Sequence, residues 1–183
     1  MGIVGILFKP NGRIRASQFW QGLIILLGLG VVTSIAQFYG PPRLAFIAGL
    51  IGFFSVYMYV CVFGKRLHDS GKTAWWVLLV FIAYFVLYLV ATLIVFPMVE
   101  GYSELQAEMT EEFAENGLDL QILAAYSERT TKLVFLPDMI IKPLVGLAIG
   151  FLCARLWSDP YPNQYGDPVG GFVEEDDQGD IFM

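Results

Sequence analysis

Four long, mostly apolar stretches separated by polar segments dominate the hydrophobic pattern of this chain. They cover residues 19–39, 44–63, 75–96 and 138–157, and the first three contain no charged residue. An α-helix of about 20 apolar residues is long enough to cross the hydrocarbon core of a bilayer. We therefore predict an all-α integral membrane protein with four transmembrane helices and an extramembrane helical insert between the third and the fourth.

Prolines and aromatic residues mark the ends of these stretches. Pro41 and Pro42 end the first one, because proline lacks a backbone donor and fixes φ. Trp75 and Trp76 open the third, where aromatic rings favour the headgroup region, and Pro97 closes it. The first two helices are therefore expected to form a tight hairpin.

A charged segment, G-K-R-L-H-D-S-G-K-T-A-W-W at residues 64–76, separates the second stretch from the third, and we call it the elbow. We expect the second helix to continue into the elbow as far as Asp69, because Gly71 suits the left-handed position that ends many helices. Asp69 is expected to pair with Lys65 or Arg66, which lie about one turn earlier on the same helix.

Residues 98–137 differ from the apolar stretches because they are rich in glutamate. Apolar residues recur there at helical spacing, which predicts an amphipathic helix that ends at Asn116 and Gly117, and a second helix is expected over 119–132. In the fourth stretch, Asp138 and Lys142 stand one turn apart and are expected to pair.

Composition and charge support a membrane protein and set its expected orientation. Hydrophobic residues make up 56% of the 183 residues and charged residues only 15%, and the net charge is −6. Seven basic residues flank the expected helices on one side (Lys9, Arg13, Arg15, Lys65, Arg66, Lys72, Arg155) and four on the other (Arg43, Arg129, Lys132, Lys142). Because basic residues concentrate on the cytoplasmic side, both termini and the elbow are expected there.

The predicted organisation has five segments. They are a cytoplasmic interfacial N-terminal segment (1–18), three transmembrane helices including the elbow (19–97), a periplasmic acidic amphipathic insert (98–137), a fourth transmembrane helix (138–157) and an acidic, mostly disordered cytoplasmic tail (158–183). Disorder is expected beyond Pro168, because that stretch has many acidic and few apolar residues.

Three polar motifs stand beside the expected helices: G-R-I-R-A-S-Q-F-W at 12–20, the elbow, and N-Q-Y-G-D-P at 163–168. In this order they resemble the bacterial DUF805 family of small inner-membrane proteins, whose function is uncharacterised. The resemblance implies a multi-pass helical protein of the bacterial inner membrane with no established catalytic residues. The insert at 98–137 is longer than the connection that the family leads us to expect.

The three motifs are expected on one side of the membrane, so their polar side chains can gather in one cluster. Basic donors beside a helix end suit an anionic group, such as a phospholipid headgroup or a phosphate-bearing ligand. The candidate ligand-binding residues are Arg13, Arg15, Lys65, Arg66, His68, Asp69 and Lys72, and the expected contacts from the tail are Asn163, Tyr165 and Asp167. The alternative is that these residues only orient the protein, satisfy helix ends and tie the tail to the elbow.

Small residues spaced about one turn apart predict two helix-packing faces. They are Ala45, Ala48, Gly49 and Gly52 in the second helix, and Gly146, Gly150 and Ala154 in the fourth.

The sequence favours a structural or interaction module over other classes of protein. Catalysis is not expected, because His68 and Asp69 are adjacent on a helix and point about 100° apart. No metal site or other cofactor is expected, and the expected partners are the lipid bilayer, anionic phospholipid, and a second copy or another membrane protein, but not nucleic acid. The alternative function is a subunit of an oligomeric small-molecule transporter or channel, which we place second because we expect no ionisable residue near a span centre.

Overall fold

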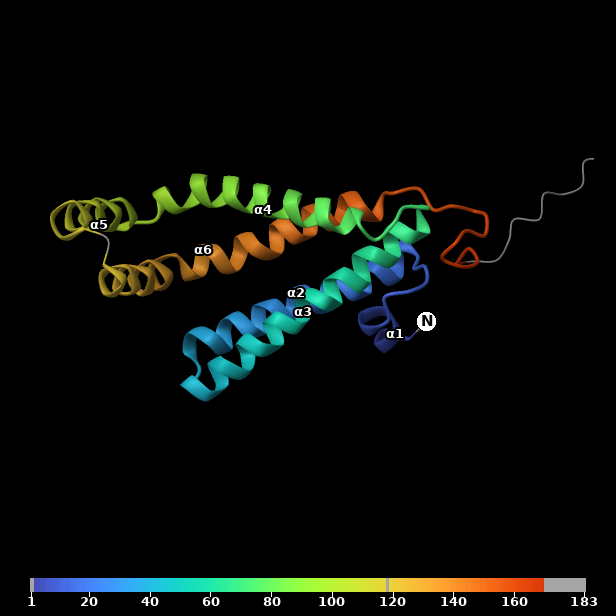
Figure 1. Ribbon diagram of the computed structural model, residues 1–183, viewed down its shortest axis with the longest axis horizontal. Helices are drawn as coiled ribbons and strands as arrows, with labels where there is room; N and C mark the ends of the chain where they lie inside the picture. The colour runs from blue at the N-terminus through green and yellow to red at the C-terminus, as the bar shows by residue number, and fades with distance from the viewer. Residues whose placement is uncertain (1, 118, 170–183) are drawn as a thin grey trace, which may run out of the picture. The chain divides into compact units, whose positions relative to one another are not determined.

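The computed structural model of the chain describes residues 2–117 and 119–169. These residues form only helices, turns and loops, with one isolated β-bridge between Asn163 and Gly166. The helices are α1 (Ile3–Phe8), α2 (Ala16–Tyr39), α3 (Pro42–Asp69), α4 (Trp76–Val95), the short 3-10 helix η1 (Phe96–Met98), α5 (Tyr102–Asn116) and α6 (Leu120–Ala154) (Figure 1).

Four segments among the described residues are long and apolar enough to cross a membrane. They are Ala16–Tyr39, Pro42–Asp69, Trp76–Met98 and Leu120–Ala154. The prediction of an all-α membrane protein with four transmembrane helices is therefore confirmed.

The chain divides into two compact units, which are described separately. The first unit comprises Met1–Phe81 and Ala148–Met183, and the second comprises Ile82–Leu147. Helices α4 and α6 each contribute residues to both units.

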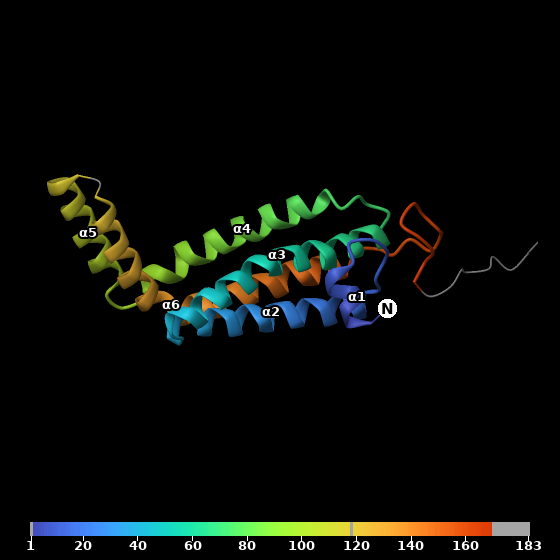
Figure 2. The same ribbon diagram turned by 60° about the horizontal axis from the view of Figure 1, so that its bottom comes forward.

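In the first unit, α2 and α3 form an antiparallel hairpin (Figures 1 and 2). The turn between them is tight because Pro42 occupies the first position of α3, where a missing backbone N–H costs nothing. At Gly22 in α2, an added Cβ would come within 2.9 Å of Ile6 and 3.0 Å of Val62. The absence of a side chain at Gly22 thus allows α1 and α3 to pack closely on α2.

Helix α3 ends at the elbow in the manner that the sequence predicts. Gly71 has φ of 71°, the left-handed region that glycine adopts without steric cost. The backbone N–H of Gly71 donates to the carbonyl of His68 at 3.0 Å, and that of Lys72 donates to the carbonyl of Leu67 at 2.9 Å. This pair of bonds is a Schellman motif, which satisfies carbonyls in the last turn of α3.

The second unit contains most of α4, then η1, α5 and the first part of α6. Helix α5 ends at Asn116, followed by Gly117 with φ of 74°, as the sequence predicts. The structure differs from the prediction in α6, which is one helix from Leu120 to Ala154 and continues through Pro137 and Pro143. Prolines are tolerated inside spanning helices because neighbouring polar groups and local adjustments compensate for the missing backbone bonds.

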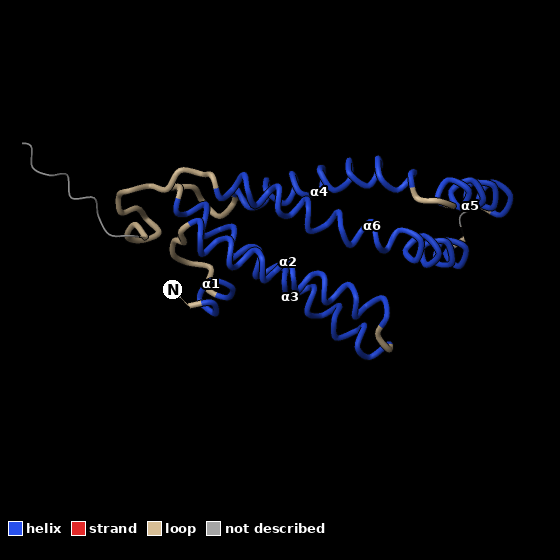
Figure 3. Tube along the Cα trace, turned by 180° about the vertical axis from the view of Figure 1, so that it is seen from behind, coloured by secondary structure: helices blue, strands red, loops and turns tan. Residues whose placement is uncertain are grey.

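After α6 the chain follows turns and loops as far as Val169 (Figure 3). The sequence predicts disorder beyond Pro168. Except for Val169, the residues concerned lie outside the described part of the chain.

Candidate functional site

The candidate site lies in the first unit and is built around Asp69, the last residue of α3. Arg66, one turn earlier on the same helix, donates from Nη1 to Oδ2 of Asp69 at 2.6 Å. Arg13, from the loop between α1 and α2, donates from Nε to Oδ1 at 3.1 Å. All three side chains are at most 2% exposed. Asp69 therefore joins the beginning of α2 to the end of α3 through a buried ionic cluster.

The remaining donors of Arg66 bind the chain at the end of α6. Nε donates to the carbonyl of Cys153 at 3.2 Å, and Nη2 donates to the carbonyls of Ala154, at 3.0 Å, and Leu156. Nη1 also donates to the Ser158 hydroxyl at 2.9 Å. Since the last carbonyls of a helix lack an intrahelical donor, a guanidinium placed here satisfies them and complements the helix dipole.

The remaining donors of Arg13 bind the segment that follows α6 and the carbonyl of Asp69. Nη1 donates to the carbonyls of Tyr161, at 2.9 Å, and Gly166, at 3.3 Å. Nη2 donates to the carbonyl of Asp69 at 3.3 Å and to that of Asp159. A buried ion pair stabilises a fold only when the other donors are also satisfied, and the carbonyls meet that condition for Arg13.

Lys65 joins α3 to α1. Its ammonium donates to the carbonyls of Gly5 and Ile6, both at 2.6 Å, and the residue is fully buried. The carbonyls belong to the last turns of α1, so Lys65 caps this short helix.

Two of the expected tail contacts reach the elbow at His68. The ring of Tyr165 stacks on the His68 ring, with 3.8 Å between centroids and 4° between planes. Asn163 donates from Nδ2 to the His68 carbonyl at 3.1 Å, whereas Asp167 is exposed. His68 Nδ1 lies 3.2 Å from the carbonyl of Gly12, a contact that requires the proton on Nδ1.

Two of the candidate residues, Arg15 and Lys72, remain exposed at the surface of the first unit. The Lys72 ammonium lies 5.2 Å from the centroid of the Trp76 ring. Trp75 is 83% exposed and Trp76 48%. The exposed cation at Lys72 thus adjoins exposed aromatic rings.

The small residues of the predicted packing faces have different surroundings. Ala48 is buried and Ala45, Gly52 and Ala154 are half-buried, whereas Gly49 is exposed. A Cβ added at Gly150 would lie 2.1 Å from the Leu23 side chain, while one added at Gly49 or Gly52 would meet nothing within 4 Å. Gly146 is buried in the second unit. Gly150 thus allows a closer approach between helices than Gly49 or Gly52 does.

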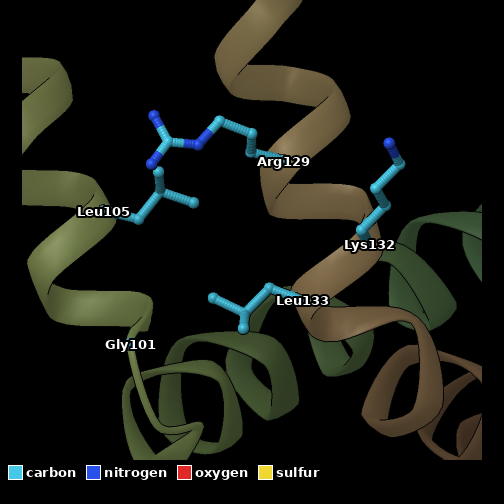
Figure 4. A pocket seen from close by; sticks show the side chains of 5 residues that line it. All are labelled: Gly101, Leu105, Arg129, Lys132 and Leu133. Carbon is cyan, nitrogen blue, oxygen red and sulfur yellow. The ribbon is translucent and has the colours of Figure 1, made fainter.

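The second unit contains a pocket that the sequence did not indicate. It is an open hollow of about 450 Å³ between α5 and α6, lined by Gly101, Leu105, Arg129, Lys132 and Leu133 (Figure 4). Both cations are already paired: Arg129 donates to the two carboxylate oxygens of Glu108 at 3.0 Å, and Lys132 donates to Glu128 at 2.6 Å. The paired charges leave the pocket with an apolar floor and little net charge.

A second polar cluster, which we call the tyrosine–aspartate cluster, joins α4 to α6 in the same unit. It consists of Tyr84, Tyr88, Asp138 and Lys142. Tyr88 donates to Oδ1 of Asp138, and Lys142 donates to Oδ2, both at 2.5 Å. The predicted pairing of Asp138 with Lys142 is confirmed, but the sequence did not indicate the contacts from α4.

Metal ligands do not gather in the described part of the chain, where no three His, Cys, Asp or Glu side chains could hold a metal ion.

In a comparison with protein families, the chain matches the family described as "Protein of unknown function (DUF805)" over residues 7–106. The matched region contains Arg13, Arg15 and the whole elbow, whereas the motif at 163–168 lies outside it. No curated protein and no solved structure matches the chain. Because the match covers more than half of the sequence, this multi-pass membrane protein belongs to the DUF805 family.

Proposed function

We propose that this protein is a structural and interaction module of the bacterial inner membrane whose exposed cations at the elbow bind an anionic phospholipid headgroup. In this proposal both termini and the elbow lie in the cytoplasm, in agreement with the distribution of basic residues along the sequence. The buried cations hold the site together, and the exposed ones contact the lipid.

The observation that supports this division is the contrast in burial between the two groups of basic residues. Arg13, Lys65 and Arg66 are buried and donate to Asp69 or to backbone carbonyls. Arg15 and Lys72 are exposed, although Nε of Arg15 also donates to the carbonyl of Val169. Only the exposed cations are accessible to a ligand without disruption of the buried cluster.

The aromatic neighbours of Lys72 favour a lipid over a soluble ligand. Tryptophan prefers the headgroup region of a bilayer, and Trp75 and Trp76 are exposed at the beginning of α4. Lys72 next to them is therefore at headgroup depth, where each basic residue contributes about 1 kcal/mol to attraction of an anionic surface.

The test is native mass spectrometry of the purified protein with phosphatidylglycerol, phosphatidylcholine and inorganic phosphate offered in turn. Wild type is expected to retain phosphatidylglycerol preferentially, and the double variant Arg15→Gln/Lys72→Gln is expected to lose this preference. The matched control is Arg129→Gln/Lys132→Gln, which removes the same charge from exposed positions on α6 and is expected to behave as wild type. Equal retention by all three proteins, or retention of inorganic phosphate instead of lipid, would overturn the proposal.

The orientation has a separate test with reporter fusions after Lys72 and after Glu115. The proposal expects them to report opposite sides of the membrane, with the first in the cytoplasm. Two fusions on the same side, or the first outside the cytoplasm, would contradict it.

A further inference from the structure

The tyrosine–aspartate cluster brings a carboxylate and an ammonium from α6 against the uncharged helix α4. Tyr88 donates to one oxygen of Asp138, and Lys142 donates to the other. Tyr84, whose ring is parallel to that of Tyr88 with 6.3 Å between centroids, donates to the carbonyl of Lys142 at 3.4 Å. The charged and titratable groups that face Asp138 are thus Tyr84 and Tyr88 from α4 and Lys142 from α6.

The position of Tyr88 along α4 places this cluster deep in the membrane. Tyr88 is the thirteenth of the 23 residues in the segment Trp76–Met98. At 1.5 Å per residue, it lies about 18 Å from Trp76 and about 15 Å from Met98 along the helix axis. Because the hydrocarbon core is about 30 Å thick, a carboxylate bonded to Tyr88 is near its middle. This inferred depth departs from the expectation that no ionisable residue lies near a span centre.

A charged side chain at this depth raises the free energy of membrane insertion, and helix packing alone does not require one. An aspartate or lysine at the centre of a spanning helix costs about 2.5–3.5 kcal/mol on insertion scales, and such residues usually mark ion or proton pathways. The Lys142 side chain is 46% exposed and that of Asp138 is 20% exposed. Hence the ammonium is able to move away from the carboxylate without repacking the helix.

Helix α6 lacks backbone hydrogen bonds near Asp138 and Lys142. Pro137 and Pro143 flank Asp138 and Lys142, and each lacks the N–H that would bond to the carbonyl four residues earlier. The bridge from Tyr88 to Asp138 therefore supports a part of α6 that has fewer backbone bonds than an uninterrupted helix.

We propose that Asp138 is a proton-binding site within the membrane, with Lys142 as its counter-charge in the ionised state. One proton adds to Oδ2, the ion pair with Lys142 ends, and the bond from Tyr88 to Oδ1 remains. The cluster changes from neutral to a charge of +1, which stays on the Lys142 ammonium as its half-exposed side chain extends toward the membrane surface.

The geometry favours a proton over other ligands. Both oxygens of Asp138 already have a donor at 2.5 Å, so a metal ion with several oxygen ligands would have to displace both. An anion would be repelled by the carboxylate. A proton needs only one oxygen and no coordination shell.

Infrared difference spectroscopy of the protein in liposomes, between neutral and acidic pH, tests this site. Wild type is expected to develop a protonated-carboxyl band on acidification, with a component that Asp138→Asn lacks and that Tyr88→Phe shifts in frequency. The matched control is Glu128→Gln on the same helix. Glu128 pairs with Lys132 four residues later at 2.6 Å, as Asp138 pairs with Lys142, but both side chains of this pair are exposed. The Glu128→Gln variant is expected to retain that component.

Lys142→Met provides a second readout that does not require Asp138 to be replaced. The pH at which the band reaches half of its height is expected to change by about one unit or more, because the ammonium that faces the carboxylate is gone. A band that is the same in wild type and in Asp138→Asn, or one that neither Tyr88→Phe nor Lys142→Met alters, would overturn the proposal. So would a wild-type protein without the band.

Discussion

Arg66 and Asp69 form an ion pair of 2.6 Å within a single turn of α3, and both side chains are 98% buried. The pair is not isolated, because Arg13 bonds to the second carboxylate oxygen, and other donors of the two arginines bind carbonyls at the end of α6 and in the chain after it. Asp69 thus links the loop before α2, the end of α3 and the segment after α6.

Replacement of Asp69 by asparagine is expected to destabilise the protein by about 3–5 kcal/mol, because two buried guanidinium groups lose their counter-charge. The measurement is unfolding of the detergent-solubilised protein by heat or denaturant. The control is Glu108→Gln, which breaks an ion pair whose two side chains are more than half exposed, and a loss below about 1 kcal/mol is expected. Equal losses in the two variants would contradict the structural role of the buried cluster.

Replacement of Tyr165 by alanine is expected to loosen the segment from Ser158 to Val169, because its ring stacks on His68. Aromatic pairs contribute about 0.5–1.5 kcal/mol beyond the area that they bury, so backbone hydrogen exchange should be up to about tenfold faster. Tyr161→Ala is the control, since the Tyr161 side chain is exposed and only its backbone carbonyl bonds to Arg13. The same increase in both variants would show that the stacked ring does not hold the segment.

Replacement of Gly150 by valine is expected to destabilise the first unit by about 1–3 kcal/mol through overpacking, because a Cβ there would lie 2.1 Å from Leu23. Gly49→Val on α3 introduces the same side chain where nothing lies within 4 Å. Thermal unfolding in detergent should therefore separate the two variants. A Gly49→Val variant as unstable as Gly150→Val would contradict this account of the packing.

The ion pair between Glu108 and Arg129 gives the contact between α5 and α6 a predicted pH dependence. Hydrogen bonds from Arg129 hold the pKa of Glu108 below its usual value of 4.5. A carboxyl whose pKa is lower in the folded than in the unfolded protein stabilises the folded state at pH values above its unfolded-state pKa. This contribution is lost as the pH falls through the folded-state pKa. Hydrogen exchange in α5, corrected for the intrinsic rate, should thus be constant from neutral pH to about 4.5 and increase below it.

Glu108→Gln should remove that dependence, whereas Glu104→Gln, an exposed glutamate one turn earlier, should preserve it. An unchanged profile in Glu108→Gln would show that another group is responsible.

The features that the sequence predicted correctly are local ones. The four spans follow from uncharged stretches of sufficient length, and the end of α3 follows from Gly71. The pairs Arg66–Asp69 and Asp138–Lys142 follow from spacings of three and four residues on a helix.

The contacts that the sequence did not predict join residues far apart in the chain. Arg13 meets Asp69 across 56 positions, and Lys65 binds the carbonyl of Gly5 across 60. Neither contact has a signal in the spacing of residues, because both depend on how α1, α2 and α3 pack. The contact of Asp138 with α4 also escaped prediction, because it depends on the alignment of α6 with Tyr88 and not on the distance from the start of an apolar stretch.

The central claim is that the exposed cations at the elbow bind an anionic headgroup while the buried ones hold the fold. The most direct measurement is the dissociation constant for phosphatidylglycerol, at low and at high salt, for wild type and for Arg15→Gln/Lys72→Gln. The account predicts that the variant binds about 30-fold more weakly at low salt, since two basic residues contribute about 2 kcal/mol. The difference should shrink at high salt, where charges are screened. Equal dissociation constants for the two proteins at low salt would contradict it.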